Sequence, residues 1–184
     1  MGQKALAGVL VALAAVVVAA PAPAGAATKG LIAPAAACPN QTTRGAPEAV
    51  QVKAMLCMVN YARERRGRPP LARLGKLARA ARGKAGDILR CDQFDHEACG
   101  REFTYWFKRV DYRGRCTAMG ENIAWGTGSL GSVRNIFRAW IGSSGHRANI
   151  LGNFQEIGIG LRVGTLDGNR GAHVWTQEFG SRTC

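Results

Sequence analysis

The segment from Met119 to Leu151 reads MGENIAWGTGSLGSVRNIFRAWIGSSGHRANIL and contains the clearest periodic pattern in the chain. Apolar residues recur there at the spacing of one helix face, namely Val133, Ile136, Phe137, Trp140 and Ile141. This spacing predicts an amphipathic helix, and Ser132 directly before it is a suitable N-cap. The apolar face must pack against the rest of a domain, which would fix the position of the residues on either side of the helix.

Two polar residues flank this helix in segments of small residues. Glu121 lies in a predicted turn with Gly120 and Asn122, and His146 lies in a second predicted turn that starts at Ser143. Functional side chains often stand on loops beside a rigid element, so we expect Glu121 and His146 to converge on one site. The alternative interpretation is that Glu121 caps local backbone and His146 is an ordinary surface histidine.

The first residues have the features of an export signal. Lys4 precedes an apolar run from Ala5 to Ala20, and Ala24 and Ala26 form an A-x-A cleavage signature. This pattern predicts a secretory signal peptide over residues 1–26, cleaved near Ala26. An uncleaved membrane anchor is the alternative, which the alanine-rich composition disfavours. No later stretch is long and apolar enough to span a bilayer, so we expect a secreted protein whose mature chain has no transmembrane segment.

Residues 27–47 are rich in Ala, Pro and Thr without any period, and are interpreted as a tether to a single domain over residues 48–184. Six cysteines in an exported chain predict disulfides rather than a zinc cluster, because no C-x-x-C pair occurs. Sequence alone leaves fifteen pairings open. The local choices are Cys38–Cys57 and Cys91–Cys99, which leave Cys116–Cys184.

The formal net charge of +13 favours anionic partners such as a cell-envelope component or a lipid surface. Nucleic acid is not expected as a partner. The one arginine cluster, Arg63, Arg65, Arg66 and Arg68, has no interleaved aromatic residues and no nucleic-acid motif. We interpret this cluster as the solvated end of a helix.

The remaining periodic segments predict an α+β domain. Helices are expected over 48–66 and 71–90, followed by a short aromatic helix over 101–108. Segment 156–163 alternates apolar residues with glycines, which predicts a strand with one bare face. It is joined by a turn at Asp167-Gly168 to a second strand over 173–179. We therefore expect helices packed on a short antiparallel sheet.

A third candidate functional residue is His96, in the loop between Cys91 and Gly100. Other familiar signals are weak. The G-x-G-x-x-G pattern at 126–131 stands outside any βαβ unit, and no nucleophile elbow occurs. A serine hydrolase that uses Ser143 or Ser144 with His146 is disfavoured, because neighbouring residues on one turn rarely reach that geometry.

Six motifs then point to a known family. In chain order they are VNYARERRGRPPL, CDQFDH, GENIAWG, AWIGSSGHRANIL, EIGIG and WTQEFG, and they cover nearly the whole predicted domain. Together they resemble the CAP superfamily of cysteine-rich secretory proteins, antigen 5 and pathogenesis-related proteins, in its bacterial secreted branch. The resemblance implies an α-β-α sandwich with a groove lined by two histidines and, in eukaryotic members, two glutamates.

By this resemblance, His96 matches the first histidine of the groove, Glu121 the glutamate of the G-E-N motif, and His146 the second histidine. The family's other glutamate is replaced here by Ser143. The paired carboxylate is therefore incomplete, which disfavours an acid/base mechanism that needs two acids. Glu156 and Glu178 are candidates to stand in, but the sequence does not place either in the groove.

Two imidazoles near a carboxylate suit a divalent cation, and zinc is the best match. His96 and His146 are the expected ligands, with Glu121 behind them or acting as a base. Further ligand contacts are assigned to Asn122, Ser143, Arg147 and Asn149.

The favoured function is a monomeric binding module, not an enzyme, for a lipid, a cell-wall fragment or a peptide. The alternative is a metal-dependent hydrolase of peptide or wall polymer that uses a zinc-bound water. A signalling or structural ectodomain is a third interpretation that the sequence does not separate from the first.

Overall fold

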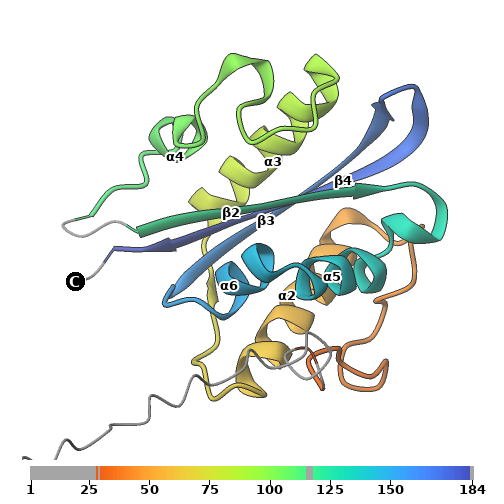
Figure 1. Ribbon diagram of the computed structural model, residues 1–184, viewed down its shortest axis with the longest axis vertical. Helices are drawn as coiled ribbons and strands as arrows, with labels where there is room; N and C mark the ends of the chain where they lie inside the picture. Colours follow the sequence, from red (N-terminus) through yellow and green to blue (C-terminus); the bar gives the residue numbers. More distant parts are fainter. Residues whose placement is uncertain (1–27, 29, 115–117, 183–184) are drawn as a thin grey trace, which may run out of the picture.

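The computed structural model describes residues 28, 30–114 and 118–182. A four-stranded sheet with the order β1-β3-β4-β2 lies between two layers of helices. In Figure 1, α3 and α4 cover one face of the sheet, and α2, α5 and α6 cover the other. This arrangement confirms the predicted α-β-α sandwich.

The helices are α2 (Glu48–Glu64), α3 (Gly75–Cys91), α4 (Tyr105–Arg109), α5 (Val133–Gly142) and α6 (Ser144–Leu151). The strands are β1 (Ala72–Arg73), β2 (Ala118–Gly126), β3 (Glu156–Leu166) and β4 (Asn169–Ser181). β3 and β4 form the predicted hairpin, and both residues of its Asp167-Gly168 turn have positive φ, as a tight hairpin turn requires. β2 pairs with β4 along its whole length, whereas β1 pairs with only two residues of β3.

The bare face of β3 is the surface on which α3 packs. A Cβ atom on Gly158 would lie 1.9 Å from the carbonyl carbon of Leu77, and one on Gly160 would lie 2.4 Å from that of Ala81. These glycines therefore let the backbone of α3 lie directly on the sheet. Gly83 of α3 itself packs against the Trp106 ring, because a Cβ atom there would lie 2.5 Å from the ring carbons.

The main apolar core lies on the opposite face of the sheet. The predicted apolar face of α5 packs into this core, and its five periodic residues are all buried. Large members of this core are Phe137, Trp140, Trp175 and Phe179. Ser132 accepts a hydrogen bond from the backbone nitrogen of Asn135 and so confirms the predicted N-cap.

The segment before α2 packs as part of the domain and is not a free tether. Leu31, Ala33 and Cys38 are completely buried in the main core. The predicted disulfide between Cys38 and Cys57 joins the segment to α2. The apolar residues of this segment do not recur at a regular spacing, so their pattern did not predict that they are buried. The predicted signal peptide, residues 1–26, lies outside the described residues.

Arg63 corrects the interpretation of the arginine cluster. Its neighbours Arg65, Arg66 and Arg68 are exposed, as expected, but the side chain of Arg63 is buried. Its guanidinium donates to the backbone oxygens of Pro69, Ile150, Gly152 and Phe154 at 2.7 to 3.2 Å. Burial lowers its pKa from the ordinary value. Arg63 thus joins α2 to the end of α6 through the many donors of one side chain.

In the described part of the chain, no helix has both the length and the apolar character needed to cross a membrane.

Candidate functional site

Glu121 stands on a strand, which corrects the predicted turn. Gly120, Glu121 and Asn122 all lie within β2 and pair with β4. The glycine that indicated a turn has a packing role instead, because a Cβ atom on Gly120 would lie 2.9 Å from the ring of Phe154. The side chain of Glu121 is 1% exposed, on the sheet face that α3 covers.

His146 likewise stands on a helix and not in a turn. Ser143 ends α5 and, in an extended conformation, precedes α6, which begins at Ser144. A run of small residues therefore marks a change of helix direction here. His146 lies in the first turn of α6 and is partly buried.

His96 and Glu121 are brought together, as the sequence predicted. The Nδ1 atom of His96 lies 2.6 Å from Oε1 of Glu121. The histidine side chain is 50% exposed, whereas the carboxylate is almost completely buried. The hydrogen bond to Glu121 raises the pKa of His96 and outweighs the opposite effect of partial burial. The contact with Glu121 therefore favours the protonated imidazole of His96.

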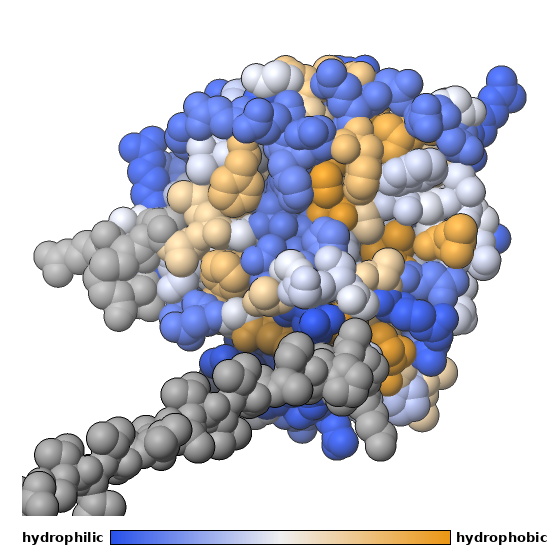
Figure 2. All heavy atoms as spheres, viewed as in Figure 1, coloured by the Kyte–Doolittle hydropathy of each residue, from blue (hydrophilic) through white to orange (hydrophobic). Residues whose placement is uncertain are grey.

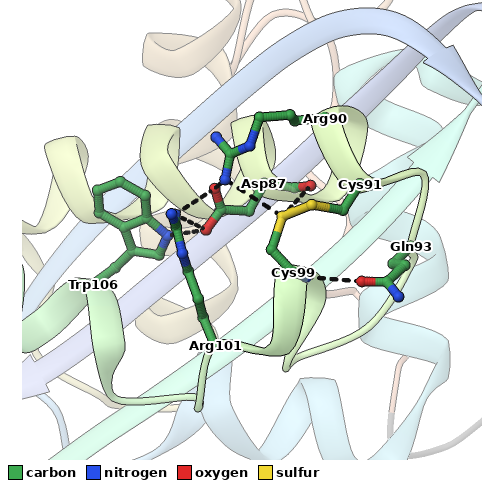
Figure 3. The surroundings of a disulfide bond; sticks show 7 residues. All are labelled: Asp87, Arg90, Cys91, Gln93, Cys99, Arg101 and Trp106. Carbon is green, nitrogen blue, oxygen red and sulfur yellow. Dashed lines mark hydrogen bonds and ion pairs between the residues drawn. A yellow bond between two sulfur atoms is a disulfide. The ribbon is translucent and has the colours of Figure 1, made fainter.

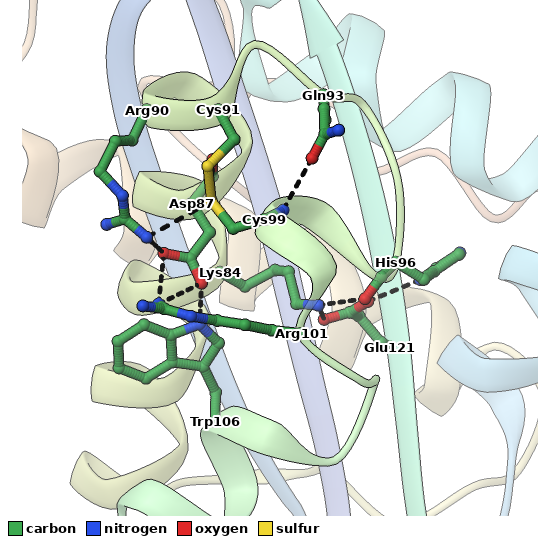
Figure 4. A network of polar contacts seen from close by, with 10 residues as sticks. All are labelled: Lys84, Asp87, Arg90, Cys91, Gln93, His96, Cys99, Arg101, Trp106 and Glu121. Carbon is green, nitrogen blue, oxygen red and sulfur yellow. Dashed lines mark hydrogen bonds and ion pairs between the residues drawn. A yellow bond between two sulfur atoms is a disulfide. The ribbon is translucent and has the colours of Figure 1, made fainter.

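Lys84 is a member of the site that sequence reasoning missed. Its ammonium group is completely buried, lies 3.7 Å from Oε2 of Glu121, and donates to the backbone oxygen of His96 (Figure 4). One side chain of α3 therefore holds both the carboxylate and the His96 loop. A signal was present, because Lys84 falls at helical spacing among the buried residues Leu77, Ala81 and Ile88.

A second set of contacts ties the His96 loop to α3 (Figure 3). The disulfide between Cys91 and Cys99 closes the loop, as predicted. Beside it, the buried carboxylate of Asp87 accepts hydrogen bonds from Arg90, from Arg101 at 2.8 Å and from the Trp106 ring nitrogen at 2.7 Å. The loop is thus fixed at several points around His96. The predicted pair Cys116–Cys184 lies outside the described residues.

The pKa values of the two site histidines are shifted in opposite directions. Partial burial lowers the pKa of His146, and the charge on His96 lowers it further. His96 therefore holds a proton to higher pH than His146 does. Groups whose pKa values are separated in this way are suited to different roles in one site.

The other four predicted contact residues form hydrogen bonds with backbone groups of the elements that carry the site. Asn122 is completely buried, and its side-chain nitrogen donates to the backbone oxygen of His146 at 3.1 Å. Asn149 donates to the backbone oxygen of Glu121 at 3.0 Å. Arg147 donates to the backbone oxygen of Ile141 at 2.6 Å, and the carbonyl of Ser143 accepts from the Arg147 nitrogen. These bonds join α6 to β2 and to the end of α5.

Glu178 lies directly opposite Glu121 in the pairing of β2 with β4. It is completely buried, and neither of its carboxyl oxygens has a hydrogen-bond partner while both glutamates are ionised. Burial raises the pKa of Glu178 well above its ordinary value, and the neighbouring charge of Glu121 raises it further. The charge of Lys84 has the opposite, smaller effect on this pKa. A proton on Glu178 would supply the missing donor between the two carboxyl groups. Glu156, the other candidate, instead accepts from Tyr112 at 2.7 Å and from Arg182.

We expect Glu178→Gln to change how stability depends on pH. Because the pKa of Glu178 is raised in the folded protein, folding retains a proton there that the unfolded chain releases above about pH 4.5. Unfolding free energy should therefore fall as pH rises from that value towards the raised pKa, and the variant should lack this fall. Urea unfolding at mildly acidic and mildly alkaline pH measures it. Parallel pH profiles for the two proteins would contradict the burial of a protonated Glu178.

The described residues contain no group of three or more His, Cys, Asp or Glu side chains arranged to hold a metal ion. His96 and His146 offer two imidazoles, and Nδ1 of His96 is already bonded to Glu121. Catalytic zinc sites commonly have three protein ligands. Zinc binding by the two histidines therefore stays a prediction, with fewer protein ligands than such a site usually has.

Comparison with known proteins identifies the family. Residues 56–179, more than half of the chain, match the cysteine-rich secretory protein family, CAP. The chain therefore belongs to this family. The uncharacterized protein YkwD of Bacillus subtilis strain 168 is 33% identical over 153 residues, which are 80% of this chain and 54% of that protein. The chain thus spans about half the length of this curated relative.

Solved structures share the fold. An extracellular protein containing an SCP domain from Bacillus anthracis Ames has a TM-score of 0.56 at 24% identity, over 72% of this chain and 40% of that one. An outer surface protein of Borrelia burgdorferi has a TM-score of 0.62 at 16% identity, over 75% of this chain and 97% of that one. At these identities the likeness concerns the fold.

Proposed function

We propose that this CAP-family protein is a secreted binding module that takes an anionic lipid, cell-wall fragment or peptide on the face formed by His96 and His146. The two disulfides among the described residues suit an oxidising compartment. The similar proteins of Bacillus anthracis and Borrelia burgdorferi, described as extracellular and outer-surface proteins, support the same location.

The contact between buried Glu121 and half-exposed His96 carries this proposal. A carboxylate on Nδ1 favours the imidazolium form, and it leaves Nε2 as the ring nitrogen that can donate to a ligand. A charged donor that is held by a buried carboxylate of β2 suits an anionic group. Figure 2 shows one face of the molecule, on which apolar residues lie in groups separated by polar ones.

Calorimetric titration of the oxidised protein with soluble muropeptides, an acidic peptide and phosphatidylglycerol vesicles tests the proposal. We expect His96→Asn to weaken binding of the preferred ligand about 10- to 100-fold, because a hydrogen bond to a charged group is lost. Lys108→Gln is the matched control, since it removes one exposed positive charge from α4. Equal affinity of His96→Asn and the wild type, or equal weakening in both variants, would contradict the proposal.

A metal-dependent hydrolase is the second candidate. The observation that favours it is the carboxylate on Nδ1 of His96, since metal-binding histidines commonly have such a partner behind them. A calorimetric zinc titration of the wild type, His96→Ala and His146→Ala tests it. Stoichiometric zinc binding that both variants lose, with turnover that Glu121→Gln abolishes, would support the hydrolase. A folded protein that binds no zinc would remove this candidate.

A further inference from the structure

The sheet edge remote from Glu121 carries a cleft with an excess of positive charge. β2 is one edge of the sheet and β1 the other, and β1 covers only Glu156 and Ile157 of β3. The rest of that edge of β3 has no neighbouring strand among the described residues. A cleft of about 410 Å³ lies there between α2 and α3, and its lining residues are Glu48, Ala49, Val52, Arg73, Arg82 and Arg162.

The three arginines of this cleft come from three different elements, β1, α3 and β3. Arg162 forms an ion pair with Glu48, the single carboxylate of the lining, at 3.1 Å. Arg73 and Arg82 form no ion pair with any residue that the structure describes. The cleft therefore keeps two guanidinium groups whose charge is not balanced by a neighbouring acid.

The positive region continues into an adjoining cleft. This second cleft, of about 240 Å³, shares Glu48 and Arg162 and extends to Arg44 and His173. Arg44 also has no ion-pair partner in the described part of the chain. α2, which is 17 residues long, begins at Glu48 in this wall, and its N-terminus adds positive potential. We call the two connected clefts the arginine cleft.

We propose that the arginine cleft binds a phosphate group, with Arg73 and Arg82 as the principal contacts. A guanidinium donates two parallel hydrogen bonds to phosphate oxygens, and it gives up its hydration more easily than an ammonium group. The volume of the cleft falls within the range of small-ligand sites. This site is separate from the His96 face and does not depend on the function proposed there.

Glu48 gives the proposal a test with a definite sign. Its carboxylate forms an ion pair with Arg162, which is then less available to a ligand, and it repels an incoming anion. Glu48→Gln should therefore tighten phosphate binding several-fold, whereas a purely structural role for this ion pair would weaken it or leave it unchanged.

The probe is sn-glycerol 3-phosphate, titrated calorimetrically into the oxidised protein at low salt. We expect the double variant Arg73→Gln/Arg82→Gln to bind at least about tenfold more weakly. The control Arg109→Gln/Arg138→Gln, which removes two exposed arginines that do not line the cleft, and His96→Asn should bind like the wild type. No binding by the wild type, or an equal loss in the Arg109/Arg138 control, would overturn the site.

Two larger probes identify the source of the phosphate. Poly(glycerol phosphate) presents the group as a soluble wall polymer, and phosphatidylglycerol vesicles present it as a lipid headgroup. Loss of binding in Arg73→Gln/Arg82→Gln with either probe supports the site, and the probe that binds more tightly to the wild type names the source. Competition by an acidic peptide but not by sn-glycerol 3-phosphate would overturn the phosphate assignment.

Discussion

Replacing Lys84 by Met is expected to lower the free energy of unfolding by about 3–5 kcal/mol. The buried ammonium lies 3.7 Å from Oε2 of Glu121, and it also donates to the backbone oxygen of His96. Methionine fills the space but leaves the buried carboxylate without its buried cation, so that only half-exposed His96 still pairs with it. Both the sheet and the His96 loop lose a connection to α3. Urea unfolding monitored by tryptophan fluorescence measures the change.

Lys76→Met is the matched control, because Lys76 lies on the same helix but pairs with exposed Asp111 at 3.8 Å. Exposed pairs contribute about 0–1 kcal/mol, so this variant should remain near the wild type. The double variant Lys84→Met/Glu121→Gln removes both charges and should recover part of the loss. A Lys84→Met protein within about 1 kcal/mol of the wild type would show that the buried pair is not formed.

Gly158→Ala is expected to destabilise the domain by about 4 kcal/mol or more, or to prevent folding. The added Cβ atom would lie 1.9 Å from the carbonyl carbon of Leu77 and 2.2 Å from the nitrogen of Ala78. These are backbone atoms of α3, so the whole helix must move away from the sheet. Since α3 carries Lys84, the contact with Glu121 would be disturbed as well.

The control for this variant is Gly86→Ala, in which a glycine of α3 itself changes. Apart from the neighbouring backbone of α3 itself, no atom lies within 4 Å of its Cβ position, so alanine fits there and should stabilise the helix by about 0.5–1 kcal/mol. Near-ultraviolet circular dichroism and thermal unfolding of both variants measure the difference. Similar stabilities for the two variants would contradict the close packing of α3 on β3.

The fold was largely predictable because its determinants are periodic. The apolar spacing of α5 indicated the correct element and the correct buried face. The alternation of β3 indicated the correct element, but both of its faces are buried over residues 157–161, and Val163 of the predicted apolar face is exposed. The bare glycines of β3 even indicated a close neighbour, although not that it is α3. The turn predicted around Gly120 was wrong because glycine is common in turns but also occurs where side chains would clash. Inside β2, Gly120 leaves room for the ring of Phe154.

The candidate site was only partly predictable, because long-range pairing decides its membership. The contact between His96 and Glu121 was expected, and the structure brings them together. Glu178 reaches Glu121 through the register of β2 with β4, which no local pattern reveals. The prediction for Arg63 was wrong for a similar reason, since its carbonyl partners lie far along the chain, beyond residue 149 for three of the four.

The most direct test of the site is an NMR titration of the three histidines in the oxidised protein and in Glu121→Gln. The hydrogen bond from Glu121 should place the pKa of His96 above 6.5, and burial should place that of His146 below 6.5. In Glu121→Gln the pKa of His96 should fall, because the bond that favours the imidazolium is lost. A wild-type His96 pKa at or below 6.5, or one that Glu121→Gln leaves unchanged, would contradict the carboxylate–histidine pair on which the proposed function rests.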